Sequence, residues 1–187
     1  TVAGREALRE LNVFQVMEFR SAVGFLLLLP LVCRAGGLTS LRTRHPFQHI
    51  VRNVVHYGAQ LGWFFALTLI PLAELVAIEF TTPIWTAILA TAFLTERMNG
   101  GKIFAVVLGL IGVIVIVRPG LGAVNVGQAI ALLAAIAFGV SIVLVKSLTR
   151  TDTALQIIFW MTVVQSIAGF IPAIAVWTWP STTAWIW

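Results

Sequence analysis

The sequence has 187 residues, of which 59% are hydrophobic and 10% charged, and its mean hydropathy is +0.99. Soluble domains average about 45–50% apolar and about 25% charged residues, so this composition excludes a soluble globular fold. The net charge of +5 does not indicate nucleic-acid binding, because the basic residues lie between apolar runs, as in membrane proteins. The single cysteine, Cys33, excludes a framework of intrachain disulfides.

Six segments approach the roughly 20 apolar residues that cross a bilayer core about 30 Å thick. In chain order they are Val13–Cys33, Arg52–Ile70, Leu72–Leu94, Lys102–Val117, Val124–Lys146 and Ala154–Trp177. Short connections rich in Gly and Pro separate most of them, as expected where helices end. The sequence therefore predicts an all-α membrane protein, a polytopic bundle of transmembrane helices.

The basic residues are divided unequally between the two sets of alternating connections. One side carries Arg34, Arg42, Arg44, Arg52, Arg97, Lys102, Lys146 and Arg150, and the other carries Arg5, Arg9 and Arg118. The positive-inside rule places the first set in the cytoplasm, which predicts a multi-pass protein of the cytoplasmic (inner) membrane. His45 and His49 fall in the longest cytoplasmic connection. We interpret them as solvated loop residues in preference to a metal site.

The run from Arg5 resembles the run from Lys146 at a constant offset of 141 residues. The matches are Arg5 with Lys146, Arg9 with Arg150, Phe14-Gln15-Val16 with Leu155-Gln156-Ile157, Phe19 with Trp160 and, after a one-residue slip, Pro30 with Pro172. Five spans separate the two runs if one span ends near Thr1. An odd number of spans per repeat inverts the second copy, a common plan of secondary transporters. The repeat predicts about ten helices, one before Thr1 and three after Trp177.

An ordered set of short motifs between Ala66 and Gly120 resembles the EamA branch of the drug/metabolite transporter superfamily. These motifs are Ala66-Leu67-Thr68-Leu69-Ile70-Pro71-Leu72-Ala73, Phe80-Thr81-Thr82-Pro83, Leu94-Thr95-Glu96-Arg97, Gly109-Leu110-Ile111-Gly112-Val113 and Arg118-Pro119-Gly120. The resemblance implies part of a ten-helix inverted-repeat carrier that moves a small metabolite across the membrane by alternating access. Residues 1–119 are then the first repeat without its first helix, and residues 124–187 are the truncated start of the second.

Ionisable side chains inside a bilayer are costly and usually have partners, so they identify candidate transport residues. Arg20, which resembles the family's arginine near the start of its second helix, and Glu79 lie at similar depths below the outer ends of their spans. We expect them to pair, either facing a central cavity, where substrate charge or a proton competes for them, or as a buried structural pair. Glu18 and Glu74 are interpreted as interfacial residues.

The span Arg52–Ile70 carries His56, Gln60 and Trp63 on one helical face, which makes them candidates for the substrate or proton pathway. For His56 a hydrogen-bonded packing role is the preferred alternative. Gly58 and Gly62 form a GxxxG motif suited to close helix contact.

Two further candidates lie in other spans. Trp160, in the last span, could stack on a substrate, and Pro83, in the third, could kink its helix as a hinge or only bend it.

No metalloprotease, nucleophile-elbow or P-loop motif occurs in the sequence, so an enzyme is the less favoured reading and a non-transporting membrane scaffold is the other alternative. The predicted partners are the lipid bilayer and a small-molecule metabolite, with no cofactor, metal or nucleic acid. Proton coupling and a homodimer are left open.

Overall fold

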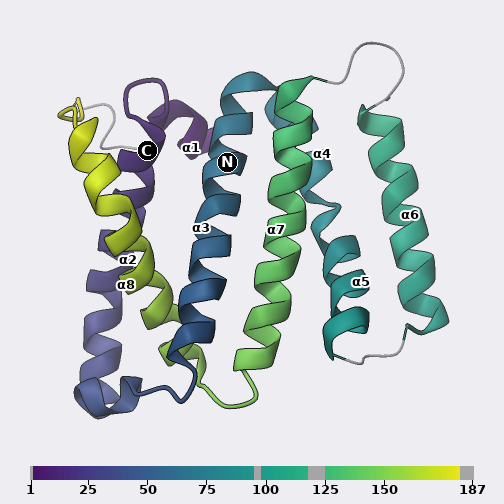
Figure 1. Cartoon of the computed structure of the whole chain (residues 1–187). Coiled ribbons are helices and arrows are strands. Elements are labelled where there is room, and N and C mark those ends of the chain that lie inside the picture. Colours follow the sequence, from purple (N-terminus) through teal and green to yellow (C-terminus); the bar gives the residue numbers. More distant parts are fainter. Residues whose placement is uncertain (1, 95–97, 118–124, 182–187) are drawn as a thin grey trace. The chain divides into compact units, whose positions relative to one another are not determined.

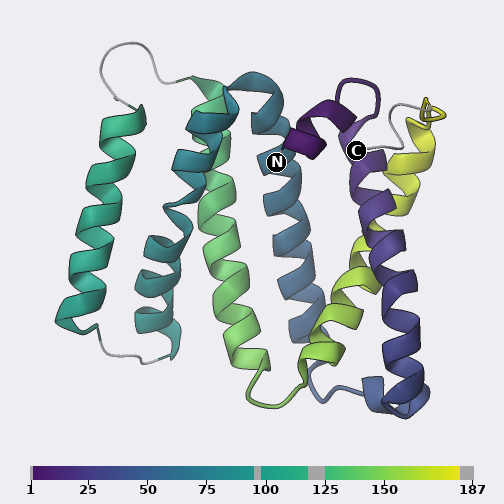
Figure 2. The same cartoon turned by 180° about the vertical axis from the view of Figure 1, so that it is seen from behind.

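The computed structural model describes residues 2–94, 98–117 and 125–181, and this part of the chain is helical and contains no strand (Figures 1 and 2). Its elements are α1 (Val2–Ala7), α2 (Val13–Arg34), the 3-10 helix η1 (Gly37–Leu41), α3 (Pro46–Leu69), α4 (Leu72–Glu79), α5 (Thr82–Leu94), α6 (Gly100–Val117), α7 (Val126–Leu148) and α8 (Ala154–Ala175). The Glu96-Arg97 and Arg118 to Gly120 parts of the family pattern lie outside the described residues.

All six predicted spans are helical in the described residues, but only four are both long and apolar enough to cross a membrane. These four are Val13–Arg34, Leu72–Leu94, Val126–Leu148 and Ala154–Ala175, while the apolar part of α6 is shorter, at Ile103–Val115. Helix α3 begins at Pro46, six residues before the predicted start, because proline suits the first turn of a helix. Polar residues inside the predicted span itself, Arg52, Asn53, His56 and Gln60, explain why α3 falls below the hydropathy of a span.

The third predicted span is interrupted, and Pro83 is not in the middle of a continuous helix as expected. Helix α4 ends at Glu79 and α5 begins at Thr82, which places Pro83 in the first turn of α5. Proline has no N–H to donate to the carbonyl four residues earlier, here that of Glu79. Thr81 stabilises the break, since its hydroxyl donates to the Ile78 carbonyl at 2.7 Å and accepts the Trp85 indole N–H at 3.1 Å.

The chain divides into two compact units, which we call unit 1 (Thr1–Tyr57 with Val145–Trp187) and unit 2 (Gly58–Leu144). In unit 1, α2 and α8 pack side by side and run in opposite directions, as both views show. Two consecutive glycines with positive φ, Gly36 at 103° and Gly37 at 73°, follow α2 and turn the chain into η1.

Unit 2 holds the C-terminal part of α3, helices α4 to α6 and most of α7, and α6 packs against α4 and α5. Small residues at intervals of four form a packing seam on α7, because Ala131 and Ala135 are buried and Gly139 lies against α5. A Cβ at position 139 would lie 2.9 Å from Cβ of Trp85 and 3.2 Å from the backbone nitrogen of Thr86. Only glycine allows this close approach of the two helices.

Candidate functional site

The interruption between α4 and α5 in unit 2 brings two predicted pathway residues together. The indole Nε1–H of Trp63 on α3 donates a hydrogen bond to Oε2 of Glu79, the last residue of α4, at 2.9 Å. Both side chains are half-buried. Gln60, one turn earlier on α3, is 8% exposed. The Glu79 carboxylate thus lies at the end of an interrupted helix and accepts a hydrogen bond from an indole on α3.

A second contact joins the start of α4 to α7 in the same unit. The Gln128 side-chain amide donates to Oε1 of Glu74, so Glu74 is bonded to a neighbouring helix. Gly62 on α3 faces Ala134 and Ile130 of α7, where an added Cβ would have ordinary van der Waals contacts. Gly58, the other half of the predicted GxxxG motif, has no such neighbour within 4 Å among the described residues.

In unit 1, Arg20 of α2 donates from Nη2 to Oε1 of Gln165 on α8 at 3.1 Å. His56 on α3 lies within electrostatic reach of Arg20 and Arg52. Arg20 and Glu79 belong to different units, and each has a partner inside its own unit. The Arg20–Glu79 pair therefore stays a prediction.

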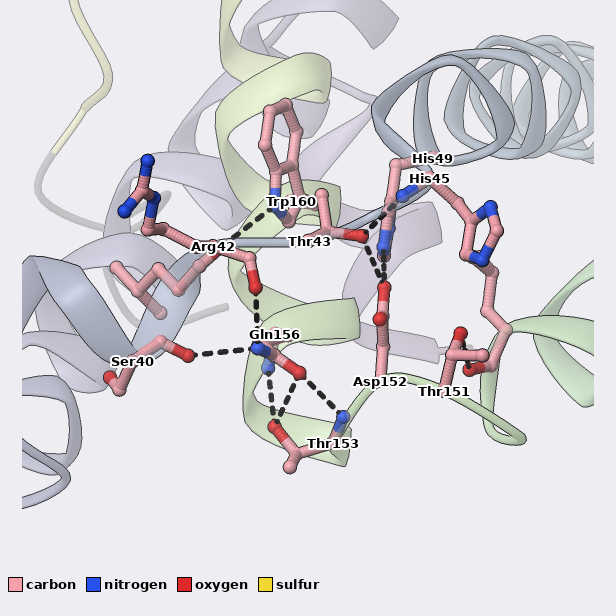
Figure 3. Close-up of polar contacts among 12 residues, drawn as sticks. Ser40, Arg42, Thr43, His45, His49, Thr151, Asp152, Thr153, Gln156 and Trp160 are labelled. Carbon is pink, nitrogen blue, oxygen red and sulfur yellow. Dashed lines mark hydrogen bonds and ion pairs between the residues drawn. The ribbon is translucent and has the colours of Figure 1, made fainter.

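Trp160 belongs to a polar cluster at one end of unit 1 (Figure 3). Its indole donates to the Leu41 carbonyl at 3.3 Å and stacks on the His49 ring, with centroids 5.6 Å apart. His49 Nε2 lies 2.6 Å from Oδ2 of Asp152, and the Thr43 hydroxyl donates to the same oxygen at 2.5 Å. The cluster joins the connection after α2, the start of α3 and the connection before α8.

The prediction that both histidines of this segment are solvated is wrong for His49. His45 is exposed, but His49 is completely buried against Asp152 and Trp160. Asp152 is not among the candidates that the sequence indicates. A signal for His49 did exist, because His49 and Asn53 extend the stripe of His56, Gln60 and Trp63 along α3 at intervals of three or four residues. No signal local to Asp152 identifies its partner, which is 103 residues away.

The ionisation of Asp152 is controlled by this cluster. Burial raises the pKa of the carboxyl, but the hydrogen bonds from Thr43 and His49, with the nearby His49 charge, outweigh burial and lower the pKa below its usual range. Asp152 is therefore ionised and can accept both hydrogen bonds at neutral pH. Among the described residues no group of three or more His, Cys, Asp or Glu side chains could hold a metal ion.

The two long helices of unit 1 carry the same local signature at their N-termini. Asn12 and Gln15 form a capping box on α2, and Thr153 and Gln156 form the same box on α8. The Gln15 side chain also donates to the Thr178 carbonyl, just after α8, at 2.8 Å. In turn, Gln156 donates to the carbonyls of Ser40 and Arg42, just after α2, at 2.9 Å each (Figure 3).

These reciprocal bonds, which we call the glutamine contacts, follow the repeat found in the sequence. Gln15 and Gln156 are the residues matched at the offset of 141, and each bonds the connection that follows the partner helix. Pro30 and Pro172, matched after the slip, both lie inside their helices. The two helices are thus alike in local structure and antiparallel in space.

Comparison with known proteins identifies a single family. Residues 1–118 match the EamA-like transporter family. The chain is 30% identical over 171 residues to an S-adenosylmethionine uptake transporter of Rickettsia conorii, covering 91% of this chain and 58% of that protein. It is 30% identical over 141 residues to a riboflavin transporter of Brucella anthropi, covering 75% and 49% of the two chains. A pseudopaline exporter of Pseudomonas aeruginosa is 26% identical over 166 residues, covering 88% and 58%.

The chain thus spans about three-fifths of the length of the first of these relatives. No solved structure matches it. The names of the relatives describe transporters and not enzymes.

Proposed function

Because this chain belongs to the EamA-like transporter family, a family of multi-pass membrane proteins, we propose that the complete protein moves a small metabolite across the cytoplasmic membrane by alternating access. The four apolar helices that are long enough to span a bilayer support a membrane location. The relatives named above for uptake and for export leave the direction of transport open.

The glutamine contacts support the inverted-repeat part of this proposal. Equivalent residues of an inverted pair are expected to make equivalent contacts at opposite ends of the membrane. Gln15 and Gln156 do so in unit 1, each at the first turn of its own helix. In secondary transporters with inverted repeats, the substrate site lies between the halves near mid-membrane.

The single observation that carries the proposed site is the hydrogen bond from Trp63 to Glu79 at the interrupted helix. Broken helices are tolerated inside a membrane where they line a cavity, because water or substrate can satisfy the freed backbone groups. A cationic or hydrogen-bond-donating group of a substrate would compete with the indole for the Glu79 carboxylate, and an aromatic ring would stack on Trp63. Arg20 and Gln165 form a second polar pair that a substrate acceptor could engage.

The curated relatives suggest the first substrates to test. Their names refer to S-adenosylmethionine, riboflavin and pseudopaline. All are organic metabolites with polar groups, which suits the carboxylate, amide and indole that Glu79, Gln60 and Trp63 provide in unit 2. We propose a substrate of this kind for the complete protein.

The test is uptake of radiolabelled S-adenosylmethionine and riboflavin into vesicles that contain the complete gene product. We expect Glu79→Gln to reduce transport at least tenfold and Trp63→Phe to reduce it less, because the carboxylate survives in the second variant. The matched controls are Glu6→Gln, at an α1 residue whose acid is paired with Arg9 just after that helix, and Trp179→Phe, at a tryptophan that is 84% exposed. Unimpaired transport by a folded Glu79→Gln protein would refute the site.

The same preparation distinguishes between the two proposed functions, a carrier and a membrane scaffold. A carrier should be stabilised against thermal unfolding by its solute, since ligand binding to the folded state raises its stability. If no solute of a wider metabolite panel is transported or stabilises the protein, the scaffold alternative is favoured.

A further inference from the structure

Glu18, interpreted from sequence as an interfacial residue, has one carboxylate oxygen buried between three helices of unit 1. A methyl group added to Gly169 of α8 would lie 2.7 Å from Oε2 of Glu18 on α2 and 3.0 Å from the hydroxyl oxygen of Tyr57 on α3. Both oxygens thus lie against Gly169, where any larger side chain would displace them. Tyr57 is itself 8% exposed.

These two oxygens are unsatisfied in the part of the chain that the structure describes. Neither Oε2 of Glu18 nor the Tyr57 hydroxyl has a hydrogen-bond partner there, and both atoms are buried. The same holds for Nε2 of Gln165, on the same helix as Gly169. Buried polar atoms are normally paired, so a group of unpaired ones in one place indicates that something else occupies or bridges the site.

Glu18 forms no ion pair among the described residues. From α8, Ser166 hydrogen-bonds the carboxylate and Gln165 is neutral. From α3, Tyr57 is the titratable group that lies within electrostatic reach of Glu18. Arg20 is on the same helix as Glu18, donates to Gln165 and lies within electrostatic reach of both Tyr57 and His56.

We propose that Glu18 is a proton-binding site in which Tyr57 and Gly169 position the carboxylate, and that this site couples transport to a proton gradient. The coupling rests on the function proposed above. A proton from one side of the membrane forms an O–H bond with Oε2, and the resulting neutral acid donates to the Tyr57 hydroxyl. Release breaks that O–H bond, and the proton passes to water on the opposite side.

Protonation resolves both observations at once. It removes the charge from Oε2 of Glu18, which is buried without a partner in the described part of the chain. It also gives the carboxyl an O–H group that can donate a hydrogen bond to the Tyr57 oxygen. A merely structural acid would instead keep one protonation state throughout the range in which the protein is folded. Titration and its dependence on Tyr57 therefore distinguish the two roles.

Infrared difference spectroscopy of the complete protein in lipid tests proton binding without any substrate. The expected result is a carboxylic-acid carbonyl band that appears as the pH is lowered, is absent in Glu18→Gln and is retained in Glu6→Gln. The band should shift in Tyr57→Phe, because the hydrogen bond is lost, and in Gly169→Ala, because the added methyl displaces the carboxylate. Circular dichroism confirms that each variant is folded.

Two spectroscopic outcomes overturn the proposal. One is the absence of a Glu18-dependent band at every pH at which the protein is folded. The other is a band that does not titrate or is unchanged in Tyr57→Phe, which would make Glu18 a structural acid.

A transport experiment tests the coupling. In vesicles that take up a probe solute, an imposed proton gradient should raise uptake by the wild type and by Glu6→Gln, while in Glu18→Gln the ratio of uptake with and without the gradient falls to unity. An equal response in Glu18→Gln refutes coupling through this residue. If the wild type transports no probe, the carrier proposal fails, and the spectroscopic result still decides whether Glu18 binds a proton.

Discussion

Replacing Asp152 by alanine removes the acceptor at the centre of the polar cluster in unit 1. The carboxylate accepts from His49 at 2.6 Å and from Thr43 at 2.5 Å, and its side chain is 3% exposed. His49 is completely buried, so after the substitution no water can accept a hydrogen bond from its Nε2–H. Thr43 is half-buried and can rotate its hydroxyl toward solvent.

The expected cost follows from these two contacts. A hydrogen bond to a charged group contributes about 1.5–3 kcal/mol, and leaving a buried donor unsatisfied costs a similar amount. Because the Thr43 bond can be replaced by water, we expect Asp152→Ala to lower the free energy of unfolding by about 3 kcal/mol. Asp152→Asn should cost less, since an amide oxygen still accepts from His49.

Equilibrium unfolding in mixed micelles with rising SDS, followed by tryptophan fluorescence, measures this cost. Trp160 stacks on His49 and reports on the cluster directly, and a Trp160→Phe protein assigns its share of the signal. His45→Ala is the matched control, because His45 is an exposed histidine of the same segment. A change below about 0.5 kcal/mol for Asp152→Ala, the range of ordinary surface substitutions, would refute the reasoning.

Three further predictions concern single groups. The lowered pKa of Asp152 means that its contribution is complete above the ordinary value of 3.8 and is lost as the pH falls through the lower folded value, so acid unfolding should be flatter in that range for Asp152→Asn. Gly139→Ala should destabilise unit 2 by about 1–3 kcal/mol, because its methyl group meets the Trp85 backbone. Gly112→Ala, with no described atom of another residue near its Cβ, should be neutral or stabilising by up to about 1 kcal/mol. SDS unfolding that gives the two variants equal stability would contradict this. Thr153→Ala should cost about 1 kcal/mol through loss of the cap, measured by the same unfolding titration, and an unchanged midpoint would argue against the capping bond.

The helices could be predicted from the sequence because a bilayer demands long apolar segments with basic flanks. The N-terminal ends of α2 and α8 were also predictable, since Gln15 and Gln156 occupy matching positions of the repeat near the start of each helix. The break before Pro83 was not. Whether a proline kinks a helix or starts a new one depends on local bonds, here those of Thr81 with Ile78 and Trp85.

Contacts between distant parts of the chain were the hardest to predict. Trp63 and Glu79 were each selected as ionisable or polar residues inside a span, but their pairing depends on how α3 packs against the interrupted helix. His49 was misassigned for a related reason, since its partner Asp152 comes from a distant connection. Hydropathy places a residue at a depth in the membrane, but it does not say which neighbouring helix covers it.

The glutamine contacts have a consequence for the balance between inward-open and outward-open states of the proposed carrier. If either end of the α2–α8 pair separates during transport, a glutamine contact must break there, and the two ends carry similar bonds. Only the end near Gln156 also carries the buried His49–Asp152 pair. Labelling rates of cysteines introduced at Thr178 and at Ser40 would compare how often each end opens.

The additional pair should hold its end closed and favour opening at the Gln15 end. With each 1.4 kcal/mol equal to a tenfold population ratio, a contribution of about 3 kcal/mol, the value expected for the Asp152 hydrogen bonds, corresponds to a bias on the order of 100-fold. A buried histidine that bonds Asp152 at one end of unit 1 would then bias which side of the membrane the empty carrier faces.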